Sequence, residues 1–352
     1  MEKENYFQRM EETYNIVRPI VEESLNSFKE YSTELYNILS MVTLGRKNNV
    51  RTYFLRSAYE AISDKDWKWI APIGAAIEFH LASTYYTNLV FDEKGGKRTR
   101  QEDKPLIIAS CITRSLANKC LYSLKDKISL DKLLDISYLF SNVDTDFYSG
   151  QYLDIITNIF DNFAFNIPRE DSFELYKKRT KGINAFFYEK IGRIASKLAG
   201  ANADQENALA EFGKNFGIAQ QIMDDVDDFV PERDGQSTVT KIPADAHSDF
   251  KHGKLTLPII NCLYHAKKED REEVVDFLKR RNELKENEFV ELTGILLKTG
   301  SIDYAKREAK EHAKKAKNAL KIFSKDKRKW LSDMCVVFDS NRYYRTLENY
   351  RR

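Results

Sequence analysis

The sequence predicts an all-α fold, formed by a single large antiparallel helical bundle that spans residues 1–352. The 352-residue chain has only 14 glycines and 7 prolines, and its apolar residues recur at spacings of three and four. No segment shows the sustained alternation of apolar and polar residues that a half-buried strand needs. Hydrophobic residues make up 42% of the chain, which is enough for a substantial core. Long helices that follow one another favour an antiparallel arrangement.

The first well-defined element is an apolar helix over residues 70–91. Pro72 and Gly74 lie near its start, and Glu78 and His80 lie in its middle. A membrane-spanning helix needs about 20 largely apolar residues, so the polar side chains indicate a buried core helix instead.

Two long helices follow in the middle of the chain. One covers residues 170–200 and ends at its glycine, and the other covers residues 203–230, opening with acidic residues and stopping before Pro231. Residues 231–250 are rich in Pro, Gly, Ser and Thr, and a loop of about 20 residues in a compact domain is usually functional or mobile. The last hundred residues return to helix, and the lysine-rich face of residues 304–323 is expected to be solvated.

The composition limits the partners of the chain. The 56 basic and 54 acidic side chains nearly cancel, so no global field favours nucleic acid or an anionic membrane. The four cysteines are scattered without a CxxC spacing, which argues for reduced thiols and against a structural zinc site. The N-terminus lacks the basic start and apolar run of a signal peptide. We therefore expect a cytoplasmic protein that is not an integral membrane protein.

Acidic residues crowd the end of the second middle helix, in the stretch GIAQQIMDDVDDFV at residues 217–230. Asp224 and Asp228 are one helical turn apart, so their carboxylates would lie about 6 Å apart on one face, with Asp225 beside them. One Mg²⁺ ion could bridge them, because Mg²⁺ prefers oxygen ligands and takes the remainder from water and substrate phosphates. The alternative is an acidic surface turn neutralised by lysines. The small and apolar residues that precede the acids favour a face that points into a cavity.

This stretch and the one downstream of it resemble the trans-isoprenyl diphosphate synthases, the polyprenyl synthetase family. FGIAQQIMDDVDDF, which contains Gln221, is similar to the second aspartate-rich motif of the family, and SDFKHGKLTLPII is similar to the segment that follows the motif. The matching positions of that segment are Asp249, Gly253, Lys254, Thr256, Leu257 and Pro258. The resemblance implies the isoprenoid synthase bundle with a central cavity, Mg²⁺ as cofactor, and substrate-binding roles for Gln221 and Lys254.

Two earlier segments resemble the family's site for isopentenyl diphosphate. GRKNNVR, which contains Lys47 and Arg51, is similar to a segment that binds the diphosphate of this substrate, with one extra residue and one Gly→Arg difference. AAIEFHLAS is similar to the helix that carries the next contact. The resemblance implies that Lys47, Arg51 and His80 hold the diphosphate of isopentenyl diphosphate.

Three further segments resemble the allylic half of the family's site. GQYLDI, at residues 150–155, is similar to a mid-chain Gly-Gln-x-x-Asp. Arg179 and Thr180 fall where the family has Lys-Thr, and Lys241 falls where a lysine binds the allylic diphosphate. The resemblance implies catalytic roles for Arg179, Thr180 and Lys241.

The chain departs from the family at the first aspartate-rich motif. Residues 87–91 read TNLVF where the family has Asp-Asp-x-x-Asp, so no carboxylate remains there. Asn88 and Asp92 share a helix face one turn apart and could form a weakened single-metal site, or the helix has simply lost its metal ligands. Downstream, Lys94 and Lys97 stand near the family's arginine pair and could contact a phosphate, although lysine lacks the bidentate fork of arginine.

Three functions remain open from the sequence. The first is condensation of isopentenyl diphosphate with an allylic prenyl diphosphate, with an unusual metal site. The second is a non-catalytic or regulatory subunit that pairs with an active homologue, since family members dimerise. The third is a class I terpene-type enzyme that ionises a prenyl diphosphate without condensing it. The retained isopentenyl diphosphate segments favour the first over the third, and the missing first motif favours the second. A homodimer or a heterodimer with a homologous subunit is expected.

Overall fold

The computed structural model describes residues 2–45, 49–92, 98–156, 169–229, 232–233, 236–237 and 247–338. Its first half contains the helices α1 (Glu2–Tyr31), α2 (Thr33–Thr43), α3 (Val50–Ile62), α4 (Ala71–Phe91), α5 (Arg100–Tyr122) and α6 (Leu130–Ile156). Its second half contains α7 (Arg169–Thr180), α8 (Phe186–Ala199), α9 (Ala203–Asp227), α10 (Ser248–Lys251), α11 (Leu257–His265), α12 (Lys268–Lys279), α13 (Glu286–Lys298), α14 (Ser301–Ala319) and α15 (Lys325–Met334). The predicted all-α fold is confirmed.

The remaining regular elements are short. In the described ranges, the 3₁₀ turns η1 (Trp67–Ile70), η4 (Leu320–Ile322) and η5 (Cys335–Phe338) flank helices, and a π-helical turn, η2 (Lys181–Ala185), joins α7 to α8. A two-residue strand β1 (Glu232–Arg233) pairs antiparallel with β2 (Gln236–Ser237).

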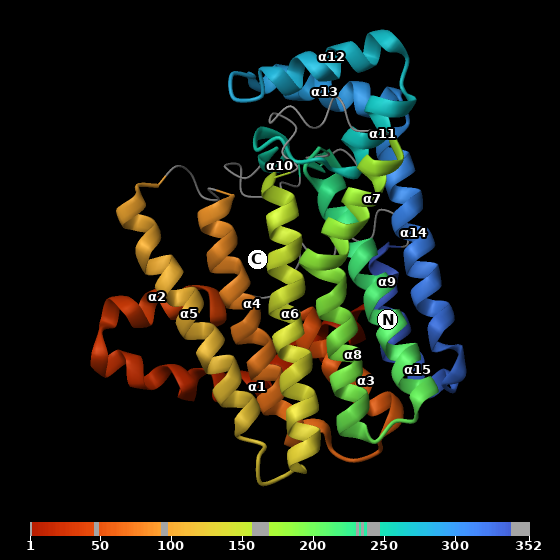
Figure 1. Ribbon diagram of the computed structural model, residues 1–352. Coiled ribbons are helices and arrows are strands. Elements are labelled where there is room, and N and C mark those ends of the chain that lie inside the picture. Colours follow the sequence, from red (N-terminus) through yellow and green to blue (C-terminus); the bar gives the residue numbers. More distant parts are fainter. Residues whose placement is uncertain are drawn as a thin grey trace.

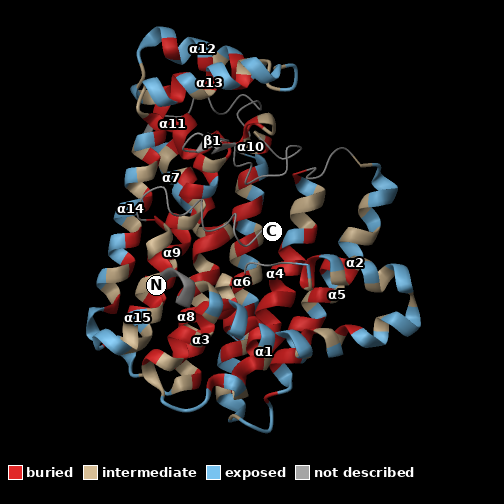
Figure 2. Cartoon of the chain, turned by 180° about the vertical axis from the view of Figure 1, so that it is seen from behind, coloured by how far each residue is buried: buried red, intermediate tan, exposed pale blue. Residues whose placement is uncertain are grey.

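The long helices stand side by side, and the shorter ones cover their ends. Figure 1 shows α4, α6, α9 and α14 running roughly along one direction, with α12 and α13 lying across one end of this bundle. Helix α4 packs against α5, and α9 packs against both α8 and α14. Buried residues follow the inward faces of these helices, while exposed residues cover their outer faces (Figure 2). The short helix α10 lies at the same end as α12, near the end of α6.

The apolar helix predicted over residues 70–91 is α4. Pro72 occupies its first turn, where the missing N–H of proline costs no helical hydrogen bond. Glu78 and His80 are 1% and 2% exposed, so the helix is buried around its polar residues as expected. Within the described part of the chain, no helix is long and apolar enough to cross a membrane.

The two middle helices were predicted with nearly correct ends, but the first is interrupted. Gly200 ends α8 in the left-handed conformation, with φ of 80°, and Asn202 caps α9 in a capping box with Gln205. The single helix predicted over residues 170–200 is divided by the π turn η2 between α7 and α8.

The predicted loop over residues 231–250 lies largely outside the described residues. Its described parts are β1, β2 and the start of α10, so the segment is not wholly irregular. The chain returns to helix as predicted in α11 to α15. In α14 a seam of buried alanines faces the bundle, while most of its lysines point outward, which is the solvated face expected from the sequence.

Candidate active site

Asp225 is the innermost member of the aspartate cluster at the end of α9. Its side chain is fully buried, and its Oδ2 accepts hydrogen bonds from the Tyr176 hydroxyl at 2.7 Å and from the Leu257 backbone N–H at 3.3 Å. Its Oδ1 accepts from Gln221 Nε2 at 3.2 Å and lies 3.8 Å from Arg179 Nη2. Burial raises the pKa of Asp225 above its ordinary value, although Arg179 opposes this shift.

Asp224 and Asp228 have different environments although they are one turn apart. Asp224 is exposed, whereas Asp228 is 2% exposed and accepts the backbone N–H groups of Asp249 at 3.4 Å and Phe250 at 3.1 Å. On the predicted shared face, the carboxylate of Asp224 is therefore exposed, whereas that of Asp228 connects α9 to α10 by hydrogen bonds.

Lys254 follows α10 and is surrounded by carboxylates. Its Nζ lies 2.8 Å from Asp154 Oδ2, 3.0 Å from Asp92 Oδ1 and 3.5 Å from Asp249 Oδ1. The side chain is 10% exposed. Burial lowers the pKa of Lys254, but the three aspartates outweigh this effect and raise it above its ordinary value, so the side chain carries a positive charge.

Arg179 forms the second positive centre of the same network. It makes a buried ion pair with Asp154, and its Nη1 donates a hydrogen bond to the Leu255 carbonyl at 3.1 Å. Burial lowers the pKa of Arg179, but Asp154 and Asp225 raise it further, so the guanidinium stays charged. Thr180, the next residue, is 1% exposed. Arg179 and Lys254 thus reach Asp154 from two sides.

Arg51 on α3 lies in a separate part of the interior. Its Nη2 donates a hydrogen bond to Asn184 Oδ1, and its guanidinium carbon lies 4.8 Å from the centre of the Tyr188 ring and 5.3 Å from that of Phe187. Among the described residues, the side-chain partner of Arg51 is the neutral amide of Asn184 and not a carboxylate, and its Nε is buried without a hydrogen-bond partner. A guanidinium held by neutral groups is well suited to bind an anion.

Asn184 connects Arg51 to the aspartate helix. Its Nδ2 donates to the Gly217 carbonyl on α9 at 2.8 Å and to Gln220 Oε1 at 3.3 Å. Gly217 and Asp225 are eight residues apart on α9, which places them about 12 Å apart along the helix axis. The two charged regions are therefore close neighbours on one rigid helix.

His80 on α4 lies near Arg51 and between aromatic rings. Its ring centre is 5.1 Å from that of Phe187, and its Nε2 lies 3.2 Å from Asp144 Oδ1 on α6. Burial lowers the pKa of His80 to about 3, with smaller contributions from Arg114 and Arg51. The imidazole is therefore neutral at neutral pH and can exchange hydrogen bonds without adding charge.

The candidate metal ligands do not converge into one ready-made cluster. Of the residues that the structure describes, no three His, Cys, Asp or Glu side chains form a group that could hold a metal by themselves. Oxygens of Asp225 and Asp228 already accept N–H or O–H donors, and Asp92 pairs with Lys254. Mg²⁺ is often bound by only one or two carboxylates plus phosphate oxygens, and Asp224, the exposed carboxylate of the three, offers a ligand for such an ion at the end of α9.

The remaining predicted site residues are Asn88 and four lysines. The Oδ1 atom of Asn88 is buried without a hydrogen-bond partner among the described residues, so its acceptor capacity is unused there. Four predicted substrate or catalytic residues lie outside the described residues: Lys47, Lys94, Lys97 and Lys241.

Sequence reasoning missed Tyr176, Asn184, Asp144 and Arg114. Tyr176 stands three residues before Arg179 on α7, so helical spacing could have placed the two on one face. The inward position of Asn184 depends on the π turn, and Asp144 meets Arg114 only through the packing of α5 and α6, at 3.4 Å between Oδ1 and Nε.

Comparisons with known proteins show the family and the fold. The family model described as polyprenyl synthetase matches residues 33–295. A short chain isoprenyl diphosphate synthase of Methanocaldococcus jannaschii is 28% identical over 335 residues, which cover 94% of this chain and 95% of that protein.

Two solved structures share the fold. Geranylgeranyl pyrophosphate synthetase from Pyrococcus horikoshii superposes with a TM-score of 0.82 at 21% identity, covering 97% of this chain and all of that one. Geranylgeranyl pyrophosphate synthase from Corynebacterium glutamicum, complexed with isoprenyl diphosphate and magnesium, gives 0.74 at 14% identity, covering 95% and 99%. With the family model matching most of its length, the chain belongs to the polyprenyl synthetase family.

Proposed function

We propose that this chain is a single-domain prenyltransferase that condenses isopentenyl diphosphate with an allylic prenyl diphosphate. The family match and the similarity to a short chain isoprenyl diphosphate synthase support prenyl transfer. Arg51 is the observation that favours condensation over ionisation alone. This arginine has no carboxylate partner among the described residues and lies close to the neutral His80. An enzyme that only ionises a prenyl diphosphate has no need for this second anion site.

The two diphosphates would occupy the two charged regions. Arg51 is held by Asn184 and stacked on Tyr188, so it can bind the diphosphate of isopentenyl diphosphate without first breaking an ion pair. Arg179 is fixed by Asp154 and the Leu255 carbonyl, so it presents a preorganised positive charge where the allylic diphosphate would leave. Holding both substrates on one rigid framework favours attack of the alkene on the allylic carbon.

Asp224, Asp225 and Asp228 are the residues that would hold Mg²⁺. Asp224 is accessible to solvent, while Asp225 and Asp228 are anchored to Tyr176 and α10, so the end of α9 is a rigid acidic edge. A bound Mg²⁺ ion would stabilise negative charge on the departing pyrophosphate. The C. glutamicum structure with isoprenyl diphosphate and magnesium supports this choice of metal.

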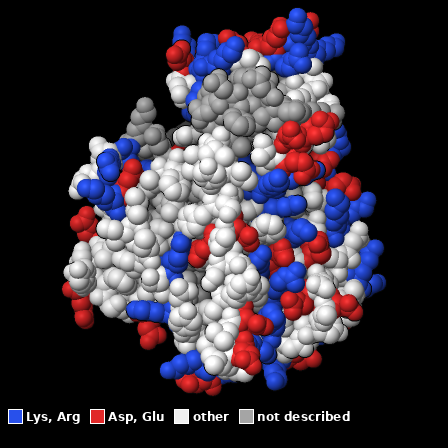
Figure 3. All heavy atoms as spheres, viewed as in Figure 1, with Lys and Arg blue, Asp and Glu red and all other residues white. Residues whose placement is uncertain are grey.

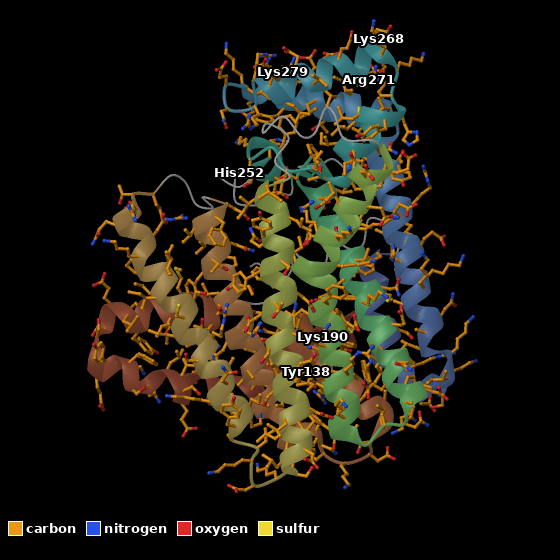
Figure 4. The ribbon with its side chains drawn as sticks, viewed as in Figure 1. Tyr138, Lys190, His252, Lys268, Arg271 and Lys279 are labelled. Carbon is orange, nitrogen blue, oxygen red and sulfur yellow. The ribbon has the colours of Figure 1, made fainter. Side chains whose placement is uncertain are left out.

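A second copy of the chain is the proposed partner. The outer face of α6 carries exposed apolar side chains at spacings of four, four, fourteen and three, which are Leu130, Leu134, Tyr138, Tyr152 and Ile155. Ile108 and Tyr122 continue the apolar surface on α5. Figure 3 shows few charged residues over these helices, and Tyr138 is labelled on α6 in Figure 4. An apolar area of this kind favours an interface between protein chains.

All four cysteines are free thiols, which favours a cytoplasmic location.

The function is tested by product analysis. Pure protein and Mg²⁺ are incubated with isopentenyl diphosphate plus each of several allylic diphosphates, and separately with each long prenyl diphosphate alone. We expect elongated prenyl diphosphates from the paired substrates only. A hydrocarbon or alcohol formed from a single substrate would instead support the terpene-type reaction. If no mixture gives a product, the result contradicts condensation and supports a non-catalytic subunit. The missing carboxylates of residues 87–91 favour that role.

A further inference from the structure

Lys254 connects three separate parts of the fold through its side-chain ammonium. Asp92 caps the C-terminal end of α4, Asp154 lies in the last turn of α6, and Asp249 lies in α10. Their carboxylate oxygens lie 3.0, 2.8 and 3.5 Å from Lys254 Nζ. An ammonium has three N–H donors and no acceptor, and here it forms ion pairs with three carboxylates.

This arrangement differs from the substrate-binding role predicted for Lys254. A diphosphate oxygen could bind the ammonium only by displacing one of the three carboxylates. The carboxylates are buried or nearly so, with side-chain exposures of 6% for Asp92, 4% for Asp154 and 15% for Asp249, and losing their counter-charge would leave a buried negative group. Lys254 is therefore bound mainly by the protein itself.

The contact between Asp92 and Lys254 is informative because of where Asp92 lies in the chain. Residues 87–91 form the last turns of α4 and contain no carboxylate, and Asp92 is the first acid after them. Asp92 approaches Lys254, whose ammonium also pairs with Asp154 on α6 and Asp249 on α10. A positive charge already links the end of α4 to the acidic side of the site.

We infer that the ammonium of Lys254 is a built-in counter-cation that joins the end of α4 to the acidic residues of α6 and α10. It takes the place of a metal ion shared between α4 and the aspartate helix α9. The inference rests on the proposed function and deepens its account of the site. Asp92 is then a positioning residue for Lys254 and not a metal ligand, and Mg²⁺ is confined to the Asp224 side. The fixed ammonium also repels a further cation from this corner by Coulomb interaction.

The test measures the shift in melting temperature that Mg²⁺ alone produces, without substrate. Lys254→Met leaves three carboxylates without their ammonium, so we expect it to melt lower than wild type and to recover more of its melting temperature on adding Mg²⁺ than wild type gains. Combining it with Asp92→Asn removes one carboxylate, and the extra Mg²⁺ response should shrink. Lys298→Met breaks a lysine–carboxylate pair elsewhere, between Lys298 and Asp270 at 2.6 Å, and should leave the response at the wild-type value.

Asp92→Asn alone keeps the inference falsifiable if Lys254→Met does not fold. We expect Asp92→Asn to retain the wild-type calorimetric affinity and stoichiometry for Mg²⁺ with inorganic pyrophosphate. Loss of bound Mg²⁺ in this variant, or an unchanged Mg²⁺ response in folded Lys254→Met, would overturn the inference. Neither measurement uses turnover, so an inactive protein with these responses would contradict the proposed function and still support the counter-cation.

Discussion

Asn184 is the residue on which the geometry of the proposed isopentenyl diphosphate site depends most directly. It accepts from Arg51 and donates to the Gly217 carbonyl, so one amide orients the arginine against α9. Its side chain is 4% exposed, and all of its hydrogen-bonding groups face described partners inside the protein. An amide is suited to this position because it fixes a guanidinium without neutralising it.

We expect Asn184→Leu to raise the KM for isopentenyl diphosphate by about 10-fold or more, because a hydrogen bond to a charged group contributes about 1.5–3 kcal/mol. The KM for the allylic substrate should change much less. Steady-state kinetics with each substrate varied in turn measures the difference. Asn215→Leu is the matched control, since Asn215, on α9, is also a buried asparagine but bonds to His312 at 2.9 Å. Equal rises in both KM values for Asn184→Leu would show a general loss of structure instead.

At the level of single residues, the sequence predicted where the acids lie but not which of them are buried and which are exposed. Asp225 is buried and Asp224 is exposed, because the inward face of α9 is set by packing against α7 and α11. The partnership of Asp92 with Lys254 joins residues far apart in the chain, so no local pattern could reveal it. Arg51 and His80 could be predicted as isopentenyl diphosphate ligands because the resemblance covers them residue by residue, and these roles stay predictions.

The π turn η2 is the element that shapes the middle of the site. It lies where α7 and α8 would otherwise form one helix, and it crosses α6 at a contact between Gly182 and Gly150. A Cβ atom at Gly150 would lie 2.6 Å from the Ile183 backbone nitrogen. Helical periodicity predicts α7 and α8 but cannot reveal a π turn, because this turn depends on how closely another helix approaches.

Gly150→Ala should destabilise the fold by about 1–3 kcal/mol, because the atoms that a new methyl would meet are backbone atoms that cannot rotate away. Chemical denaturation of the variant and wild type measures the free energy of unfolding. Gly294→Ala on α13 is the control, since its Cβ would meet nothing within 4 Å. There the helix propensity of alanine should add about 0.5–1 kcal/mol of stability. Similar effects at the two glycines would contradict the close crossing of α6 and η2.

At the scale of the whole molecule, the exposed apolar side chains of α6 form the proposed interface between two chains. Leu134 and Tyr138 on this face are 58% and 68% exposed. We expect Leu134→Glu to convert a dimer into a monomer in analytical ultracentrifugation, because a buried charge without a partner is costly. Val290→Glu on α13 should leave the assembly unchanged, although Val290 is also 68% exposed. A monomeric wild-type protein would contradict the proposed interface.

The contact between α14 and α9 gives the molecule a pH-dependent stability. Burial lowers the pKa of His312 to about 4, and Lys315, Lys181, Lys177 and Lys214 act in the same direction. Between an unfolded value of about 6.5 and the folded value, the unfolded chain binds the extra proton, so stability falls as the pH falls through this window.

We expect His312→Gln to become more stable relative to wild type by about 1–2 kcal/mol when the pH is lowered from 7 to 5, because glutamine takes up no proton in either state. Urea denaturation at both pH values measures the change. A stability difference that stays constant between these pH values would mean that His312 is protonated in the folded protein as readily as in the unfolded chain.

We propose that one bundle holds two diphosphate sites, one at Arg51 and one at the acidic end of α9. The most direct measurement is the rate at which labelled isopentenyl diphosphate enters product, with each substrate and Mg²⁺ varied, in wild type, Arg51→Met and Asp224→Ala. We expect elongation by wild type, a raised KM for isopentenyl diphosphate alone in Arg51→Met, and loss of Mg²⁺-dependent turnover in Asp224→Ala. Absence of elongated product from wild type with every allylic diphosphate would contradict the claim.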